Sequence, residues 1–506
     1  MTVRPSRRDV LRTGAALAAL AALPGCGPAL SKIAQFVETT PGGVGLPKGD
    51  VVDPIFHSLL RVAWGPRPGD IEHVREMGRD AWLEQQLDPE AIDDGACDVR
   101  LMDCTLIEEP PQELMSVQEQ LIAREMARAA LIRAVHSRRR ILEVMCSFWN
   151  DHFSIDMGKK GCMQTKPFDD ATVVRRHALG KFRDLLGASA KSSAMLFYLD
   201  GASNRGGSAS EPPNENYARE LMELHTLGVR GGYTQKDVME AARCLTGWTV
   251  EDRGGLRLFH RGEVVFRPDR HDDGAKVVLG HEIPAGGGEA DVERLLDLVA
   301  SHPSTQRRIA WKLCRKLVAD PPPESVVALA TKEFAATGGD IAATLRQILA
   351  TPDFETSAGL KVKRPFDFVV TAMRVTGAEC RAGGKEIDLL TRMGHVPFRY
   401  PTPDGYPEEP EPWMGTLLWR WNFALALATG RLGQSKCDLE ALARRAGLDP
   451  ARNSPADMAP LFLGRAATPS EREAVEAYAS RPGGDRGARR REAVALVLAG
   501  PGFQVT

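Results

Sequence analysis

The chain has 506 residues, of which 43% are hydrophobic and 26% are charged, a balance typical of a folded globular protein rather than a disordered one. Its 65 lysine and arginine residues are almost matched by 67 acidic residues, which leaves a formal net charge of -2. A nucleic-acid partner, which requires a clear excess of positive charge, is therefore not expected.

The first 26 residues predict an export signal. Arg7 and Arg8 lie in the run S-R-R-D-V-L-R, which resembles the bacterial twin-arginine box, and an Ala/Leu-rich stretch follows at 13–23. That stretch is shorter than the roughly 20 apolar residues of a permanent membrane span, so we expect the segment to be removed. Twin-arginine substrates cross the membrane folded, and a common reason is a cofactor loaded beforehand.

The signal ends in L-P-G-C at Cys26, which resembles a lipobox. We expect Cys26 to become the acylated N-terminus and to anchor the protein in the periplasm or on the outer face of an envelope membrane, since two or more acyl chains give stable attachment. An ordinary cleaved signal with an incidental cysteine and an uncleaved signal anchor are the two alternatives.

After the signal, residues 27–52 are spaced by glycine and proline and predict a flexible tether. Eight further cysteines follow, and none forms a C-x-x-C pair, so a cysteine-rich metal or iron–sulfur site is not expected. Cys97 and Cys104 are the tightest pair, and a disulfide between them in an oxidising compartment is left open.

Helical periodicity dominates the rest of the chain and predicts a main domain at 53–430 and a C-terminal helical segment at 431–506 packed on it. The expected helices are 55–63, 70–87, 115–135, 139–149, 171–199, 213–228, 234–246, 289–300, 303–319, 324–336, 340–350, 363–376, 411–430, 437–446, 456–463, 469–480 and 486–499.

One region predicts strands, at about 248–280. Apolar runs at 248–250, 256–259, 264–266 and 276–279 are separated by turn residues, which indicates a small antiparallel sheet with Trp248 as a packing anchor. The expected fold class is therefore mainly α, a large multi-helix body with a small antiparallel β insertion. No dinucleotide fingerprint or phosphate loop is present.

The segment 214–228 suggests a metal site. On a regular helix Asn216, Glu220 and Glu223 share one stripe, and two carboxylates one turn apart suit a divalent cation. Such pairs are completed elsewhere by histidines, and His152 and His271 each lie beside acidic and apolar residues. The hypothesis thus has four ligands, His152, Glu220, Glu223 and His271, oriented by Asn150, Asn216, Arg219 and Asp272.

Two other interpretations remain open for this segment. Glu215, Arg219 and Glu223 form a charge ladder that is common on solvated helices. Glu220 or Glu223 beside Arg219 or Arg243 is also a candidate general base that needs no metal. The sequence contains neither a G-x-S-x-G elbow nor an H-E-x-x-H motif, so serine-hydrolase and zincin chemistry are not favoured.

A proline-rich loop at 399–407 carries Tyr400 and Tyr406, and three tryptophans follow it at 413, 419 and 421. We expect these aromatic side chains either to pack in the core, or to wall a pocket, or to contact an extended ligand or a partner.

Several runs together resemble one family. F-W-N-D-H-F at 148–153, N-E-N-Y-A-R-E-L-M-E-L at 214–224, G-G-Y-T-Q-K-D-V at 231–238, L-T-G-W at 245–248 and H-D-D-G-A-K at 271–276 are similar, in this order, to segments of the bacterial domain-of-unknown-function 1800 family. The resemblance covers the chain from about residue 53 onward. The matching positions include His152, Asn216, Arg219, Glu220, Glu223, Asp237, Trp248, His271 and Asp272, whereas the family tends to have an aromatic residue where this chain has His225.

The resemblance implies an exported protein of unknown activity, often encoded beside a second exported protein that resembles sulfatases or phosphatases. Two hypotheses are consistent with it. The chain is an envelope enzyme that depends on a metal or another cofactor, or it is a non-enzymatic lipoprotein that binds or assembles another exported protein. Whether it is an enzyme, and which cofactor it uses, stay open here.

Overall fold

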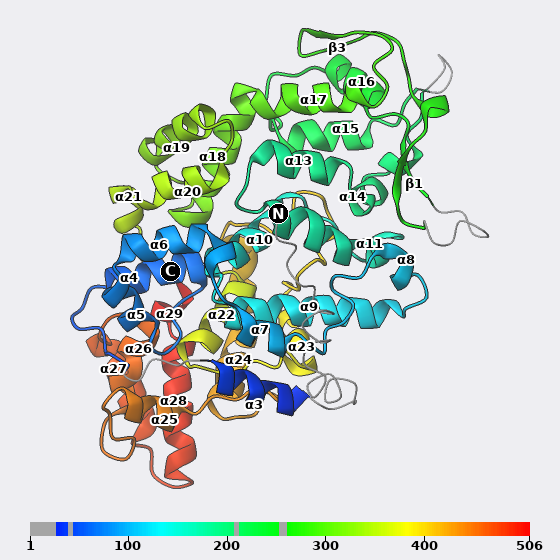
Figure 1. Cartoon of the computed structure of the whole chain (residues 1–506). Coiled ribbons are helices and arrows are strands. Elements are labelled where there is room, and N and C mark those ends of the chain that lie inside the picture. The colour runs from blue at the N-terminus through cyan, green and yellow to red at the C-terminus, as the bar shows by residue number, and fades with distance from the viewer. Residues whose placement is uncertain (1–26, 39–43, 207–211, 252–260) are drawn as a thin grey trace.

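The computed structural model describes residues 27–38, 44–206, 212–251 and 261–506. Arg7, Arg8 and Cys26 lie outside these ranges, so the export signal and the acylation site stay predictions. The fold class is confirmed, since the chain is mainly α with two small antiparallel sheets (Figure 1). In the described part of the chain no helix combines the length and the apolar character that a membrane span requires.

The expected tether contains a helix instead. Helix α3 (Gly27–Val37) buries Leu30 and Ala34, which are one helical turn apart, and leaves Phe36 93% exposed. The Ser31 hydroxyl and the Gln35 amide bond the main body at Arg381 and Glu379. Glycine and proline spacing concealed this short apolar stripe, so the expectation of an unstructured tether is not met over these residues.

The first half of the chain is a succession of helices. Helix α4 begins where Asp53 accepts hydrogen bonds from the backbone of Ile55 and Phe56, with Pro54 at its first position. The helices are α4 (Pro54–Ala63), α5 (Asp70–Met77), α6 (Arg79–Leu87), η1 (Pro89–Ala91), α7 (Gly95–Arg100), α8 (Pro111–Leu114), α9 (Glu119–His136), α10 (Arg140–His152), α11 (Cys162–Asp169), α12 (Arg175–His177), α13 (Phe182–Ala190), α14 (Ser193–Tyr198) and η3 (Gly201–Ser203).

Two helical segments widen into π geometry. Segment η2 (Asp170–Val174) joins α11 to α12, and η4 (Leu221–His225) continues α15 (Asn216–Glu220). A π turn changes the angular spacing of side chains, so the regular-helix stripe assumed for 214–228 does not hold beyond Glu220.

The β insertion follows α16 (Gln235–Cys244) and consists of two hairpins. Strand β1 (Trp248–Val250) pairs with β2 (Val264–Phe266), and β3 (Lys276–Val278) pairs with β4 (His281–Ile283). The 3-10 turn η6 (Pro268–Arg270) lies between the hairpins. The strand expected at 256–259 lies outside the described residues, and the insertion extends to Ile283.

The second half returns to helices and closes against the first half. Helix α26 (Ala459–Leu463) lies beside α4 (Figure 1), where the Asp53 backbone N–H donates to the carbonyl of Gly464, the residue that ends α26. The helices are α17 (Ala290–Ser301), α18 (Pro303–Leu317), α19 (Glu324–Ala336), α20 (Ile341–Leu349), α21 (Pro352–Glu355), α22 (Pro365–Val375), α23 (Gly384–Arg392), η7 (Glu411–Thr416), α24 (Leu417–Ala428), α25 (Leu439–Arg445), η8 (Pro455–Met458), α26 (Ala459–Leu463), α27 (Pro469–Ala479), α28 (Arg486–Ala499) and α29 (Pro501–Gln504).

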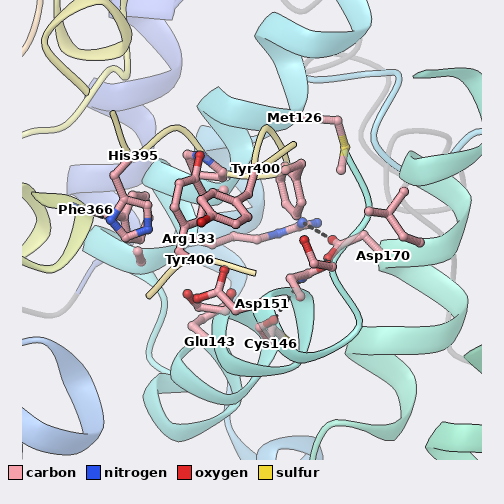
Figure 2. A pocket seen from close by; sticks show the side chains of 18 of the residues that line it. Met126, Arg133, Glu143, Cys146, Asp151, Asp170, Phe366, His395, Tyr400 and Tyr406 are labelled. Carbon is pink, nitrogen blue, oxygen red and sulfur yellow. Dashed lines mark hydrogen bonds and ion pairs between the residues drawn. The ribbon is translucent and has the colours of Figure 1, made fainter. Parts of the chain in front are cut away.

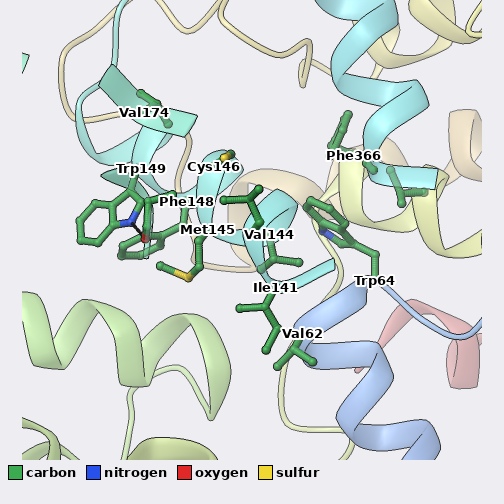
Figure 3. Close-up of a cluster of buried hydrophobic side chains, with 14 of the residues drawn as sticks. Val62, Trp64, Ile141, Val144, Met145, Cys146, Phe148, Trp149, Val174 and Phe366 are labelled. Atoms are coloured by element: carbon green, nitrogen blue, oxygen red, sulfur yellow. Dashed lines mark hydrogen bonds between the residues drawn. The ribbon is translucent and has the colours of Figure 1, made fainter. Parts of the chain in front are cut away.

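Helix α10 lies at the centre of the core. Its apolar face, which includes Ile141, Val144, Phe148 and Trp149, extends to Trp64 at the end of α4 (Figure 3). The Trp149 indole donates to the Ala178 carbonyl at 2.9 Å, which satisfies its buried N–H. This anchoring fixes the opposite, polar face of α10.

Candidate functional site

The polar face of α10 borders a pocket, which we call the central pocket. It contains about 60 Å³ of solvent-accessible space, enough for several waters or for the end of a small ligand. Figure 2 shows aromatic side chains gathered on one side and Asp170 on the other, with Arg133 extending between them. The walls come from α9, α10, η2, α22 and the segment 395–406.

The aromatic wall is built by the proline-rich loop. Tyr406 is 8% exposed and its hydroxyl donates to the Val396 carbonyl at 2.7 Å, while its ring lies 4.7 Å from that of Tyr400. His395 is buried and stacks on Trp413 with ring centroids 5.2 Å apart. Two of the expected roles are thus met, since Tyr406 and Trp413 are buried in the core while Tyr400 and Tyr406 also wall the pocket.

A glycine lets the loop close onto α10. Gly405 has a φ of +77°, and a Cβ at this position would lie 2.0 Å from the Asp151 carbonyl oxygen. No other residue type fits both the backbone conformation and the space.

The opposite wall is a polar stripe on α10. Glu143, Ser147 and Asn150 recur at helical spacing on α10, and Ser154, just beyond its end, also lines the pocket. The Asn150 amide donates to the Cys146 carbonyl at 2.9 Å and to Asp170 Oδ1 at 2.8 Å, while its own Oδ1 is buried without a hydrogen-bond partner. An unsatisfied buried acceptor costs about 1–3 kcal/mol, so a ligand that donates here is favoured.

Two charge pairs support this wall. Arg175 Nη1 donates to Glu143 Oε2 at 3.0 Å, and its second amino group contacts the other carboxylate oxygen, so the pair is bidentate. Arg133 lies 3.8 Å from Asp170 Oδ2 and also contacts Glu108 at 3.3 Å. These pairs balance the charges of Glu143 and Asp170 and hold both carboxylates at the pocket.

Asp151 is the carboxylate with an altered proton affinity. Burial raises its pKa above the ordinary value, although the Arg364 guanidinium, 2.7 Å away, opposes the shift. A carboxyl group with a raised pKa that lines a pocket is a candidate for proton exchange with a ligand. The pocket therefore combines an aromatic wall, an unsatisfied acceptor and a perturbed carboxyl.

The four proposed metal ligands do not converge. His152 is buried, with Nε2 3.1 Å from the His225 carbonyl oxygen and Nδ1 2.8 Å from Lys312 Nζ. Burial and the charge of Lys312 hold the pKa of His152 well below its ordinary value, so the ring is neutral. Both nitrogens are occupied, which leaves none for a metal.

His271 belongs to a different cluster, in the β insertion. Its Nδ1 lies 2.9 Å from the Thr246 carbonyl oxygen and its Nε2 lies 3.2 Å from Asp291, which also binds Lys276 at 2.6 Å. Asp272, expected to orient a histidine, instead accepts two bonds from Arg243 at 2.7 and 3.0 Å. These residues hold the hairpins against α16 and α17.

Glu220 and Glu223 do lie near each other, on a partly exposed surface. Burial, followed by the neighbouring charge of Glu223, raises the pKa of Glu220. Glu223 lies 3.6 Å from Arg219, while Arg243 is paired with Asp272 and Glu240. Of the two arginines considered for a general base, only Arg219 is therefore placed beside one of these glutamates.

The remaining orienting residues also have local roles. Asn216 donates to the Leu199 carbonyl at 3.1 Å, and Arg219 bonds Glu215 and Gln235 at 2.9 Å each. Among the residues that the structure describes, no group of three or more His, Cys, Asp or Glu side chains is placed to hold a metal ion. The geometry gives the proposed metal set no support.

The cysteines contribute packing. Cys97 and Cys104 are both buried thiols, and no disulfide joins them. Burial, the largest influence, raises the pKa of the Cys97 thiol well above its ordinary value, which makes it a poor nucleophile.

Only part of the central pocket was predicted from the sequence. Tyr400 and Tyr406 were expected as candidates for a pocket wall and Asn150 as an orienting group for a metal, but none of the charged lining residues was singled out. The available signal was the polar spacing Glu143, Ser147, Asn150 within an otherwise apolar helix. Arg133 and Arg175 carried no such signal, because arginines are common on solvated helix faces.

The architecture defines a class: a mainly helical protein with a small β insertion and a central pocket under a proline-rich loop. A family model described as "Protein of unknown function (DUF1800)" matches residues 57–505, and the chain belongs to this family. The match includes α10, η4 and the loop that closes the pocket. No curated protein and no solved structure matches the chain significantly.

Proposed function

We propose that this protein is exported by the twin-arginine route, anchored to an envelope membrane through acylated Cys26, and binds a small molecule in its central pocket. The observation that carries the ligand proposal is the pairing of the Tyr400–Tyr406 wall with the buried, unpartnered Asn150 oxygen. A molecule with a flat apolar body and a hydrogen-bond donor suits these two surfaces.

Asp151 makes the pocket suitable for proton transfer. Its raised pKa makes proton uptake easier than for an ordinary carboxyl, and its contact with Arg364 stabilises the carboxylate form. We therefore favour an enzyme that uses acid–base chemistry in this pocket. Because both ring nitrogens of His152 and of His271 are occupied, we place no metal on these residues.

The ligand proposal is tested on protein purified from its native envelope. Organic extraction and mass spectrometry should identify a small molecule that co-purifies with the wild type and is lost from Ser147→Leu, because leucine occupies the pocket and removes its polar floor. Ser470→Leu, at an exposed site, is the matched control. Equal occupancy in the two variants would contradict the proposal.

The anchor is tested separately. The N-terminal peptide of the native protein should begin at Cys26 and carry acyl chains, and replacing Arg7 and Arg8 by lysine should leave the precursor in the cytoplasm. A soluble Cys26→Ser variant that remains exported would separate anchoring from export. An unmodified initiator methionine on the native protein would contradict both.

The alternative is a binding lipoprotein with another exported protein as its partner. The structure offers a surface other than the 399–410 loop: Met414, Leu418, Trp421 and Leu425 are 55%, 59%, 50% and 36% exposed and, at spacings of four, three and four, share one face of η7 and α24. Exposed Glu411 begins η7, so a partner with basic residues around an apolar centre fits better than an anionic lipid surface.

Co-expression with an exported protein that resembles sulfatases or phosphatases tests this alternative. A complex that survives mild detergent and is lost in Trp421→Glu would support it. Leu329→Glu, an isolated residue 45% exposed on α19, is the control. Self-association of the purified chain, or binding to vesicles alone, would count against a protein partner.

A further inference from the structure

A second, larger cavity lies on the other side of the α9–α10 junction, and we call it the arginine cleft. Its volume is about 690 Å³, which is the size of a small organic ligand. Its walls come from the end of α3, from α5 and α6, from the α9–α10 turn, and from the segment after α22. Trp82 of α6 provides an apolar wall.

Asp70 lines the arginine cleft, and its carboxylate oxygens already accept hydrogen bonds from the protein. It accepts a bond from Arg140 Nη2 at 2.6 Å and one from the Arg67 backbone at 2.5 Å, and Arg374 lies 3.6 Å away. Although burial raises its pKa, Arg140 and Arg374 bring the pKa below the ordinary value. Asp70 is therefore an ionised carboxylate that does not require a further donor.

The arginines around it are not satisfied. Arg140 Nε and Nη1 are buried without hydrogen-bond partners, and so is Arg374 Nη2. Arg140 is held in place by Asp70 and by the face of Trp82, 6.0 Å from its guanidinium. Two donors of one oriented guanidinium thus remain unused at the cleft wall.

His136 adds a second kind of donor, an imidazole N–H. Its side chain is fully buried and lines the cleft, and its Nε2 accepts the Cys380 backbone N–H at 3.1 Å. Burial, with Arg67 and Arg100, holds its pKa well below the ordinary value, so the ring is neutral. The proton must then be on Nδ1, which is buried and has no partner. This orphan group is also a donor.

The charged residues around the cleft also favour an anionic ligand. Arg67, Arg138, Arg140 and Arg445 line the cleft, and Arg100 and Arg374 contact its carboxylates from behind. The lining carboxylates are four: Glu38, Asp70, Asp93 and Glu379. The four lining guanidinium groups match the four lining carboxylates in number, and Arg100 and Arg374 add two positive charges beside a cavity whose unsatisfied groups are donors.

We propose that the arginine cleft binds a phosphate ester. Phosphate oxygens accept bonds from several directions at once, and guanidinium groups match them in pairs. The phosphate lies against Arg140 and His136, and the organic part occupies the remaining volume beside Trp82. The ester is either a soluble molecule or the headgroup of a phospholipid, since both offer the same group. This proposal does not depend on the central pocket or on acylation.

The probe for the soluble source is glycerol 3-phosphate, titrated into the full-length detergent-purified protein by calorimetry. Saturable binding is expected, weakened about tenfold or more in Arg140→Lys, which keeps a charge but loses the paired donors. Arg138→Gln, an exposed cleft residue, should weaken binding less, and it covers the case in which Arg140→Lys does not fold. Arg452→Gln, 89% exposed and outside the cleft lining, should bind as the wild type does.

The second probe is a short-chain phosphatidylglycerol, with phosphatidylcholine of the same chain length as its comparison. If phosphatidylglycerol saturates the site and glycerol 3-phosphate does not, the phospholipid is the source. If glycerol 3-phosphate competes, the soluble ester is the source. The proposal would be overturned if neither probe bound saturably, or if Arg140→Lys bound a probe as tightly as the wild type does. Water would then be the occupant of the cleft.

Discussion

At the scale of single residues, Lys312 shows how a buried histidine is kept out of metal chemistry. Its ammonium contacts His152 Nδ1, and no carboxylate of the described chain lies within ion-pair distance of it. Burial, then the charge of Arg308, lowers its pKa to about 7. Keeping the buried Lys312 ammonium charged therefore has a cost, which is a lower free energy of unfolding.

This cost predicts a pH dependence. Between about pH 7 and pH 10 the unfolded lysine, with a pKa of about 10.4, holds a proton that the folded one has lost, so wild-type stability rises with pH. Lys312→Met removes this contribution. We expect the free energy of unfolding of the wild type, minus that of the variant, to rise by roughly 1 kcal/mol per pH unit across this window.

Urea unfolding at pH 7, 8 and 9 measures the difference. Lys332→Met, at an exposed position of α19, is the control and should follow the wild type in parallel. Parallel curves for Lys312→Met as well would show that the lysine is not held near neutrality.

At the scale of elements, the pocket depends on how one loop meets one helix. Gly430 ends α24 with a φ of +69° and open space around it, whereas Gly405 combines a φ of +77° with the Asp151 carbonyl. Gly430→Ala should cost about 1 kcal/mol from backbone strain. Gly405→Ala should cost roughly 3 kcal/mol or more, because strain and a backbone clash add. Thermal unfolding measures both costs, and amide hydrogen exchange of the 399–407 loop reports whether the loop opens. Equal costs for the two variants would contradict the role of Gly405.

Helix α3 offers a second prediction at this scale. Leu30 is 1% exposed and Phe36 on the same helix is 93% exposed. Leu30→Ala should lower the free energy of unfolding by about 2–4 kcal/mol, since it leaves a cavity, and Phe36→Ala should change it by less than about 0.5 kcal/mol. Denaturant unfolding of the two variants decides between a docked helix and a tether, for which neither change would matter.

Regular helices were predictable from sequence, and deviations from regularity were not. The helix expected at 324–336 matches α19, and the one at 486–499 matches α28, because periodicity alone decides both. The helix expected at 171–199 is instead divided among a π segment and three helices. The proposed metal ligands assumed regular helical spacing over 214–228, and the π segment η4 changes that spacing. They also assumed free histidines, but the residue that contacts His152 Nδ1 is Lys312, which is distant in sequence.

At the scale of the whole molecule, one charge network joins the two halves of the chain. Glu408, directly after the proline-rich loop, lies 3.2 Å from Arg364, 3.7 Å from Lys316 and 3.5 Å from Lys361. Arg364 in turn contacts Asp151 of α10. The loop that walls the central pocket is therefore tied by charge to α10, α18 and the start of α22.

This network predicts how the protein responds to acid. Burial raises the pKa of Glu408, but Arg364, Lys316 and Lys361 outweigh it and hold the pKa well below the ordinary value. A depressed carboxylate pKa contributes stability above the unfolded value of about 4.3, and the contribution is lost as pH falls further. Glu408→Gln should therefore cost about 2–3 kcal/mol at pH 7 and progressively less below pH 4. Guanidinium unfolding from pH 7 to pH 3 measures this cost, with exposed Glu411→Gln as the control. A cost that does not depend on pH would mean that Glu408 acts by packing. The two halves of the chain would then be joined by the fit of their surfaces rather than by charge.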